Sequence, residues 1–322
     1  MAVNIASVAD AARPTTVIES VRLNRRLAAC LTLVSETFQH TGSFKFRAAY
    51  SVAGGVAQAT IITASSGNFG QALAYACSLL GKSCLVVMPD NSSEVKVAAV
   101  REYGGAVELV DTGRKSRAQA VQELAAKNPE AYVASAYDDD LVIQGNATLG
   151  REICALGKRF DCVVVPIGGG GLSAGILTGI REAGRNFRVI AAEPLLANDA
   201  ARSLRSASLI ADCRESTTIA DGARTLSLGG RNWEILKNGL WDLIEVPDET
   251  IEEAVRQLFL LANLKVEPTG ALGLAAILTQ PERFAGKSVC CVVSGGNVDN
   301  EVYRRILAGQ SSRPAMSAGE RG

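Results

Sequence analysis

The sequence predicts an α/β protein built from two open, mainly parallel twisted sheets that are flanked by helices. Short runs of β-branched and apolar residues alternate with segments of helical periodicity, and Gly81 and Gly104 close two of these segments. The chain has 322 residues, of which 48% are hydrophobic, so it can bury the cores of about two domains. We expect a large domain from residues 1–50 and 139–322 and a small domain from residues 51–138.

In the first 135 residues, predicted helices come first, and predicted strands and helices then alternate regularly. We expect an N-terminal helix, a break at Pro14, and a helix that begins near Lys45 and continues toward Ala57. The other predicted helices are residues 20–29, 69–80, 94–103 and 115–127, and the predicted strands are residues 30–35, 61–64, 84–88, 107–110 and 132–135.

A second series follows three consecutive aspartates, residues 138–140. The predicted helices are residues 141–156 and 172–183, and the predicted strands are residues 162–167, 187–192, 243–246 and 288–293. The tail from Gln310 is rich in Ser, Gly and Ala, which predicts disorder. No long linker separates the two series, so the two sheets should share chain crossings.

Charge and composition exclude several classes of function. The 33 basic residues balance the 33 acidic ones, which gives no electrostatic case for binding nucleic acid or an anionic membrane. No apolar run is long enough for a transmembrane helix, and the N-terminus lacks the basic region of a secretory signal. The single histidine argues against His-based zinc sites and Ser-His-Asp triads. We therefore expect a cytoplasmic protein whose partner is a small molecule.

Lys45 lies between Phe44 and Phe46, just after a glycine turn at a predicted helix start. Desolvation by these two rings would favour the neutral amine, which is the form that makes a Schiff base. The alternative is a structural lysine whose aliphatic stem packs along the aromatic side chains. The octapeptide of residues 41–48 leaves both interpretations open.

Three glycine-bearing loops lie where a predicted strand ends. Residues 65–71, Ser-Ser-Gly-Asn-Phe-Gly-Gln, supply hydroxyls, N–H groups and a helix N-terminus, a combination that suits a carboxylate. The run Gly168–Gly171 leaves bare amides at a helix start, and these suit a phosphate. Residues 294–297, Ser-Gly-Gly-Asn, end the last strand in a similar way.

The glycine run also allows a different interpretation. Gly169-x-Gly171-x-x-Ala174 fits a dinucleotide fingerprint, and Glu193 lies 24 residues after Gly169, near the position of a ribose-binding acid. This pattern would indicate an NAD-dependent oxidoreductase. It would leave Lys45 and the loop at residues 65–71 without a function.

Six motifs occur in a recognisable order: Thr41-Gly-Ser-Phe-Lys-Phe-Arg, Ser65-Ser-Gly-Asn-Phe-Gly-Gln, Gly168-Gly-Gly-Gly-Leu, Thr218-Ile-Ala-Asp-Gly, Glu267-Pro-Thr-Gly and Ser294-Gly-Gly-Asn-Val-Asp. Together they resemble the serine/threonine dehydratase and serine racemase family, which consists of pyridoxal-phosphate (PLP) enzymes of the tryptophan-synthase-β fold, or fold type II. The resemblance covers residues 13–299. It implies that Lys45 forms the Schiff base with PLP and moves the substrate Cα proton. We also expect a homodimer.

The resemblance implies further site residues. Those expected around the cofactor are Lys45, Phe44, Asn68, Gly168, Gly169, Gly170, Gly171, Leu172, Glu267 and Ser294, and those expected around the substrate are Ser65, Ser66, Gly67, Asn68 and Phe69. Asn68 would bond the pyridine 3-hydroxyl, and Ser294 would face the ring nitrogen. A neutral hydroxyl there does not stabilise a protonated ring as a carboxylate would, which favours loss of a β-substituent.

The implied reaction is an ammonia-lyase reaction. A 3-hydroxy amino acid such as serine or threonine, or a bulkier analogue, would lose water and yield a 2-oxo acid and ammonia. Ser66 resembles the residue that acts on the opposite substrate face in racemases, although it could serve only to bind the carboxylate. An amino acid racemase and a PLP β-replacement enzyme therefore remain alternatives.

A divalent cation site is implied by the segment that begins at Glu193. Glu193, the carbonyl of Ala197 and Asp199 match a family segment that binds a cation, and oxygen ligands favour Mg²⁺, Mn²⁺ or Ca²⁺. The alternative is a surface turn with solvated acids.

One departure from the family affects the substrate. Phe69 stands where the family usually has histidine, beside the expected carboxylate site. This substitution makes the pocket more apolar and favours a bulkier or specialised substrate.

Overall fold

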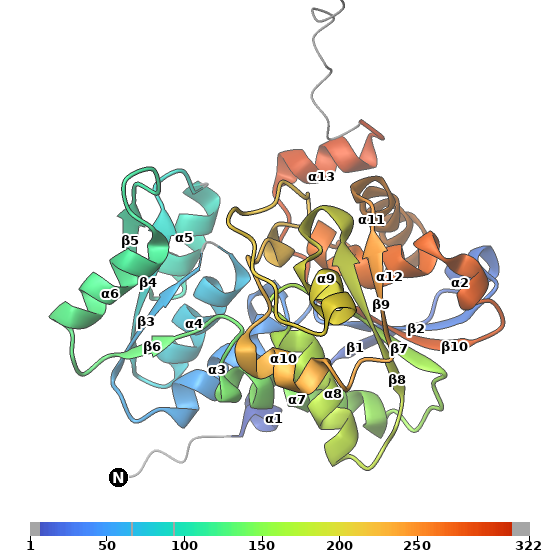
Figure 1. Cartoon of the computed structure of the whole chain (residues 1–322), viewed down its shortest axis with the longest axis horizontal. Helices are drawn as coiled ribbons and strands as arrows, with labels where there is room; N and C mark the ends of the chain where they lie inside the picture. The colour runs from blue at the N-terminus through green and yellow to red at the C-terminus, as the bar shows by residue number, and fades with distance from the viewer. Residues whose placement is uncertain (1–6, 66, 93, 311–322) are drawn as a thin grey trace, which may run out of the picture.

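Two sheets organise the part of the chain that the computed structural model describes, residues 7–65, 67–92 and 94–310 (Figure 1). The larger sheet has six strands in the order β1-β2-β10-β7-β8-β9, and the smaller sheet has four in the order β5-β4-β3-β6. All strand pairs except β1 with β2 are parallel, so the predicted fold class is confirmed. The tail expected to be disordered falls almost entirely outside the described residues.

The larger sheet is buried on both faces. Its strands are β1 (Thr16–Ile18), β2 (Cys30–Ser35), β7 (Cys162–Pro166), β8 (Arg188–Pro194), β9 (Asp242–Val246) and β10 (Ser288–Val293). β7 is buried along its whole length, and β10 along all but its first residue. Such strands read as continuous apolar runs because helices cover both sides.

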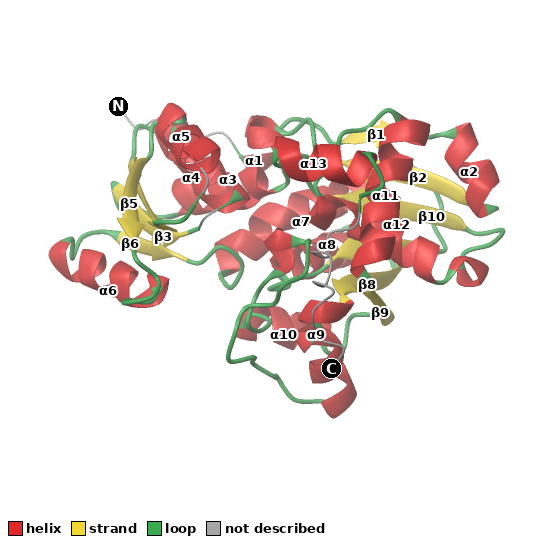
Figure 2. Cartoon of the chain, turned by 90° about the horizontal axis from the view of Figure 1, so that it is seen from above, coloured by secondary structure: helices red, strands yellow, loops and turns green. Residues whose placement is uncertain are grey.

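Helices from different parts of the chain cover the two faces of the larger sheet (Figure 2). One face packs against α2 (Val21–Leu27), α11 (Asp248–Ala262), α12 (Pro268–Thr279) and α13 (Asn300–Leu307). The other face packs against α7 (Asp140–Ala155), α8 (Gly171–Glu182), α9 (Asp199–Ser206) and α10 (Gly230–Leu236). α12 and α8, on opposite faces, are both deeply placed, since nine of the 12 residues of each are buried.

The smaller sheet consists of β3 (Thr60–Ala64), β4 (Ser83–Pro89), β5 (Ala106–Val110) and β6 (Tyr132–Ala134). One face packs against α1 (Val8–Ala11), α3 (Lys45–Gly55), α4 (Asn68–Leu79) and α5 (Glu94–Glu102), and the other against α6 (Arg117–Lys127). The remaining short helices are η1 (His40–Gly42), η2 (Leu195–Ala197), η3 (Asp221–Ala223) and η4 (Pro281–Arg283).

The chain crosses between the sheets twice. It leaves the larger sheet after β2 through η1 and α3, and it returns after β6 through α7. In open α/β sheets, ligands bind outside the carboxyl ends of the strands. Among the described residues, none of the helices combines the length and the apolar character that crossing a bilayer requires.

Candidate active site

Lys45 is the first residue of α3, and the loop after β10 fixes its position. Ser43 forms an isolated antiparallel bridge with Gly295, and the Phe44 N–H donates to the Ser294 carbonyl at 3.0 Å. Ser294 directly follows β10 and is 1% exposed. Lys45 therefore lies at the carboxyl ends of two neighbouring strands, β2 and β10.

The Lys45 amine is held in a largely apolar environment. Its Nζ donates to the Ala136 carbonyl at 2.7 Å and lies 5.1 Å from the ring centroid of Phe44 and 5.6 Å from that of Phe69. Burial lowers the pKa of Lys45 to about 8, although the charge of Glu267 opposes this shift. A substantial share of this amine is therefore neutral near physiological pH.

The expectation that Phe46 shields the amine together with Phe44 is wrong. The ring of Phe46 is fully buried in the core of the smaller sheet, with its centroid 4.7 Å from that of His40 and 5.6 Å from that of Tyr50. Successive side chains on a helix point about 100° apart, so Lys45 and Phe46 face different surroundings. Phe69, from the first turn of α4, is the second ring beside the amine.

A chain of side-chain amides and a carboxyl group joins three loops beside Lys45. Asn297 Nδ2 donates to the Thr41 carbonyl at 2.7 Å and to Asn68 Oδ1 at 2.8 Å, and Asn68 Nδ2 donates to Glu267 Oε1 at 2.8 Å. Glu267 is 6% exposed. Burial raises the pKa of Glu267 to about 8, and the charge of Asp221 adds to the shift.

The four glycines Gly168–Gly171 connect β7 to α8, as predicted. Gly170 is the N-cap, with a φ of 89° that disfavours any residue with a side chain. The first backbone hydrogen bond of α8 runs from the Ala174 N–H to the Gly170 carbonyl at 2.8 Å. The N–H groups of the first helical turn precede this bond and so have no partner within the helix. Such a turn can bind a phosphate.

Tyr137 and Asn232 enclose the glycine loop. A Cβ atom added at Gly169 would lie 2.4 Å from the ring of Tyr137, so only glycine fits there. Asn232 Nδ2 donates to the Tyr137 carbonyl at 2.9 Å and to the Gly169 carbonyl at 2.6 Å. Because Ala136 accepts the hydrogen bond of Lys45, adjacent residues of one loop contact the amine and the glycine loop.

The loop before α4 is shaped by Ser65, whose Oγ accepts from the N–H groups of Gly70 at 3.0 Å and Gly67 at 3.4 Å. Asn68 and Phe69 begin α4 and reach Glu267 and Lys45 respectively. The expected carboxylate loop and the amine are thus neighbours. Ser66, expected to act in catalysis, lies outside the described residues.

The residues expected to bind a divalent cation stand at the carboxyl end of β8 and directly after it, and none of them contacts Lys45 among the interactions of that residue described above. Glu193 is fully buried, and its two carboxylate oxygens accept from the Ala200 and Ala201 N–H groups at 2.8 Å each. Asp199 is 1% exposed, and both of its carboxylate oxygens lack a hydrogen-bond partner. Ala197 is the last residue of η2 and is also buried.

Sequence reasoning missed the buried residue that fixes α3. Arg47 is fully buried; its guanidinium donates to Glu36 at 2.8 and 2.9 Å, to Glu152 at 2.5 Å and to Thr148 at 3.0 Å. These partners lie after β2 and on α7, so Arg47 ties both chain crossings together. The sequence offered one signal for this role, namely that Arg47 follows the catalytic candidate Lys45 by two residues. The contacts of Asn297, which stands in the predicted loop of residues 294–297, and those of Tyr137 and Asn232 were missed because their partners are distant in sequence.

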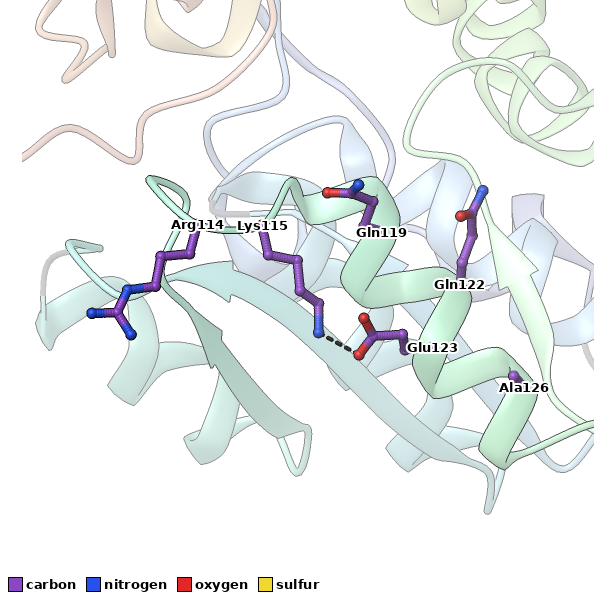
Figure 3. Close-up of a pocket in the computed structure, with 6 residues that line it drawn as sticks. All are labelled: Arg114, Lys115, Gln119, Gln122, Glu123 and Ala126. Atoms are coloured by element: carbon purple, nitrogen blue, oxygen red, sulfur yellow. Dashed lines mark hydrogen bonds and ion pairs between the residues drawn. The ribbon is translucent and has the colours of Figure 1, made fainter.

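A cavity of about 510 Å³ lies elsewhere, on the surface of α6 (Figure 3). Its lining residues are Arg114, Lys115, Gln119, Gln122, Glu123 and Ala126, and Lys115 pairs with Glu123. None of the candidate site residues lines it. We attribute its shape to the mostly polar side chains of α6 and of the turn before it.

Comparison with known proteins places these features in a family. The model of the family "Pyridoxal-phosphate dependent enzyme" matches residues 8–295. L-threo-3-hydroxyaspartate ammonia-lyase from Saccharomyces cerevisiae is 33% identical over 306 residues, which cover 94% of this chain and 93% of the relative. Beta-hydroxyaspartate dehydratase from Paracoccus denitrificans is 37% identical over 291 residues, 89% of this chain and 91% of the relative.

Serine racemase from Schizosaccharomyces pombe is 33% identical over 301 residues, 92% of this chain and 93% of the relative. Among solved structures, the threonine deaminase of T.th. superimposes with a TM-score of 0.86 at 37% identity, covering 91% of this chain and 96% of the other. The matched region contains Lys45, the glycine loop and the loop before α4. The chain therefore belongs to the family of pyridoxal-phosphate dependent enzymes.

Proposed function

We propose that this chain is a PLP-dependent ammonia-lyase that removes water from a 3-hydroxy amino acid and yields a 2-oxo acid and ammonia. The observation that carries the proposal is the Lys45 amine, with its lowered pKa, between the carboxylate loop and the glycine loop. The relatives named as hydroxyaspartate ammonia-lyase and dehydratase support this reaction class. Family membership favours PLP over the NAD interpretation of the glycine run.

The residues present fit the cofactor. The N–H groups of the first turn of α8 have no partner within that helix and suit a phosphate group. The Tyr137 ring packs so closely on Gly169 that the loop has room for no side chain, which keeps its backbone bare. We propose that the phosphate is held by Gly168–Gly171 and Leu172, and the ring by Phe44, Asn68, Glu267 and Ser294. When bound, PLP supplies an aldehyde that forms imines with amines and a ring that withdraws electrons from the substrate Cα.

Lys45 would take the proton from the substrate Cα. Its pKa of about 8 keeps a useful fraction of the amine neutral, and the Ala136 carbonyl holds it in one direction. Phe44 and Phe69 exclude water from the amine. We propose that the loop at residues 65–69 orients the substrate by its carboxylate, because the N-terminus of α4 offers N–H groups there.

The substrate proposed is a 3-hydroxy amino acid, with serine, threonine and 3-hydroxyaspartate as candidates. The relatives support 3-hydroxyaspartate in particular. Racemisation is the second candidate activity, because a serine racemase matches the chain over 92% of its length and Ser66 stands in the carboxylate loop. β-Replacement on the same fold is the remaining alternative.

We also propose that Glu193, Ala197 and Asp199 bind Mg²⁺, Mn²⁺ or Ca²⁺. A buried carboxylate without a partner, such as Asp199, carries a large desolvation cost that a cation would offset. Removal of divalent cations by a chelator should lower the melting temperature of the wild type. It should leave the melting temperature of Asp199→Asn unchanged.

The domain division at residues 1–50 with 139–322 and 51–138 remains our proposal, supported by the separate hydrophobic cores of the two sheets, with residues 46–50 and Val142 crossing the boundary into the core of the smaller sheet. A homodimer is also proposed. Support comes from exposed apolar side chains on adjoining elements, namely Val21 of α2 at 64% exposure and Phe259 and Leu260 of α11 at 42% and 59%. Sedimentation velocity of the wild type and of Leu260→Glu tests this assembly.

Two measurements test the proposed function. The purified protein should absorb visible light as a PLP enzyme, and Lys45→Ala should abolish both this absorbance and turnover, whereas the exposed Lys127→Ala should keep both. A panel of 3-hydroxy amino acids should be assayed for 2-oxo acid release, with chiral analysis of the recovered substrate. Turnover by Lys45→Ala at the wild-type rate would refute the lyase proposal, and inversion without 2-oxo acid would identify a racemase.

A further inference from the structure

A second cavity, of about 70 Å³, lies at the amino ends of the central strands of the larger sheet. Its buried lining consists of Cys162, the first residue of β7, Ile190 of β8 and Phe284, which are 4%, 5% and 1% exposed. The other lining residues are Asp161, Arg188, Trp241, Arg283 and Lys287. Lys45 and the glycine loop lie at the opposite ends of these strands, roughly 17 Å away for a strand of five residues.

Three cationic side chains from separate segments line this cavity. Arg283 is compensated, since its guanidinium pairs with Asp242 at 2.5 Å. Arg188 and Lys287 have no carboxylate within ion-pair distance among the described residues, and the Arg188 guanidinium stacks on Trp241 at 4.1 Å from the ring centroid. The Asp161 carboxylate accepts from the Ser288 N–H at 2.8 Å. The cavity thus keeps an excess of positive charge.

The three cationic side chains influence the buried Cys162 thiol inside the cavity as well as the exposed rim. Burial raises the pKa of the Cys162 thiol to about 11, while Lys287, Arg283 and Arg188 each oppose this shift and Asp161 adds to it. The fields of all three cations therefore reach the buried end of the cavity.

We propose that this cavity is a binding site for a small, doubly charged oxyanion, and we choose inorganic phosphate as its representative. A cavity of about 70 Å³ has room for a small ion with four oxygen atoms and too little room for a nucleotide. A planar guanidinium can bind two oxygens of such an ion, and a lysine ammonium can bind a third. The proposed ammonia-lyase reaction does not use this site.

Occupation of the site has a structural consequence. Arg188 begins β8, Arg283 ends η4, and Lys287 directly precedes β10. A shared anion would join these three segments and relieve the repulsion between their charges. Because it binds the folded state only, it should stabilise the protein against unfolding.

The experiment titrates the holoenzyme, whose cofactor site is filled, with phosphate at constant ionic strength. Binding is measured by isothermal titration calorimetry and by the fluorescence of Trp241 in Trp233→Phe, which leaves Trp241 as the remaining one of the two tryptophans. We expect one saturable site and a fluorescence change, with no saturation by chloride. Arg188→Gln and Lys287→Ala should each weaken binding about tenfold or more, while Arg25→Ala, on the exposed surface of α2, should bind like the wild type.

Three results would overturn the proposal. One is a signal that grows without saturation or is matched by chloride. Another is unchanged affinity in both Arg188→Gln and Lys287→Ala. The third is binding to the cofactor-free protein alone, which would assign the phosphate to the glycine loop. Cofactor absorbance, recorded for every variant, verifies that the proteins compared are folded.

Discussion

Asn68 donates from Nδ2 to Glu267 Oε1 at 2.8 Å, across 199 residues of sequence. This bond joins the first residue of α4, which covers the smaller sheet, to the residue before α12 of the larger sheet. The Oδ1 atom of the same Asn68 amide accepts a hydrogen bond from Asn297 Nδ2. The orientation of Asn68 beside Lys45 is therefore set by side chains from two distant loops.

Asn297→Ala should release Asn68. The variant loses two hydrogen bonds, at 2.7 and 2.8 Å, and leaves a backbone carbonyl and an amide oxygen without that donor. We expect a loss of about 1–3 kcal/mol in the free energy of unfolding and about tenfold weaker cofactor binding. Urea unfolding and absorbance titration with PLP measure these effects. Asn128→Ala, which loses an exposed bond to Leu124 on α6, is the control and should retain wild-type cofactor affinity.

Glu267→Gln should change the pH dependence of stability. The folded protein keeps Glu267 protonated up to about pH 8, whereas the unfolded chain ionises it from about pH 4.5. Between these values the unfolded state binds fewer protons, so wild-type stability falls as the pH rises. Relative to wild type, Glu267→Gln should gain on the order of 3 kcal/mol in unfolding free energy between pH 5 and pH 8. Urea unfolding of the cofactor-free proteins measures this difference, and parallel profiles would contradict it.

Covalent loading of PLP by Lys45 should depend on pH with a midpoint near 8. Burial lowers the pKa of this amine from 10.5 to about 8, so the reactive neutral form increases up to that pH and then levels off. Stopped-flow absorbance after mixing cofactor-free protein with PLP gives the profile. In Glu267→Gln the midpoint should move to lower pH, because Glu267 stabilises the ammonium form. A midpoint above pH 10 in the wild type would contradict the assigned environment.

Gly169→Ala should disrupt the glycine loop. The added methyl group would lie 2.4 Å from the Tyr137 ring, far inside contact distance, so the loop or the ring must move. We expect at least about tenfold weaker cofactor binding, measured by absorbance titration. Gly230→Ala is the matched control, because its added Cβ meets no atom closer than 4.0 Å. Equal affinities for the two variants would show that the loop tolerates the displacement.

Arg47→Met should destabilise the protein strongly. It leaves the carboxylate of Glu36, whose side chain is 0% exposed, and that of Glu152 without their cation. Removing one partner of a buried ion pair costs about 3–5 kcal/mol. Urea unfolding provides the comparison with Arg304→Ala, which breaks an exposed pair with Glu301 and should unfold like the wild type. If the two variants lost the same free energy of unfolding, the idea that burial makes the Arg47 ion pairs more important than an exposed pair would be refuted.

Much of the fold was predictable because the parallel strands are buried on both faces and read as apolar runs between helical segments. β1 was not predicted, since it has only three residues and depends on antiparallel pairing with β2. α12 was also missed. It is apolar on all sides, so no helical periodicity distinguishes it from a buried strand.

Within the candidate site, the ends of strands β7 and β10 could be predicted because glycines and polar residues follow apolar runs there. The second aromatic ring beside the Lys45 amine, that of Phe69, could not be predicted from the sequence. Phe46 is the neighbour of Lys45 in sequence but points into the core, and Phe69 comes from α4. Long-range partners such as Asn297 and Asn232 carry no local signal, since their bonds span loops that only the folded chain brings together.

Lys45 stands at the outgoing chain crossing, and its hydrogen-bond acceptor Ala136 stands just before the returning one. The Lys45 amine and the carbonyl that orients it thus lie at the two chain crossings between the sheets. A rotation of one sheet against the other, as in admitting a substrate, would alter the reach of the amine in the same motion. Such a movement between the sheets would therefore also change the distance between the Lys45 amine and the Ala136 carbonyl.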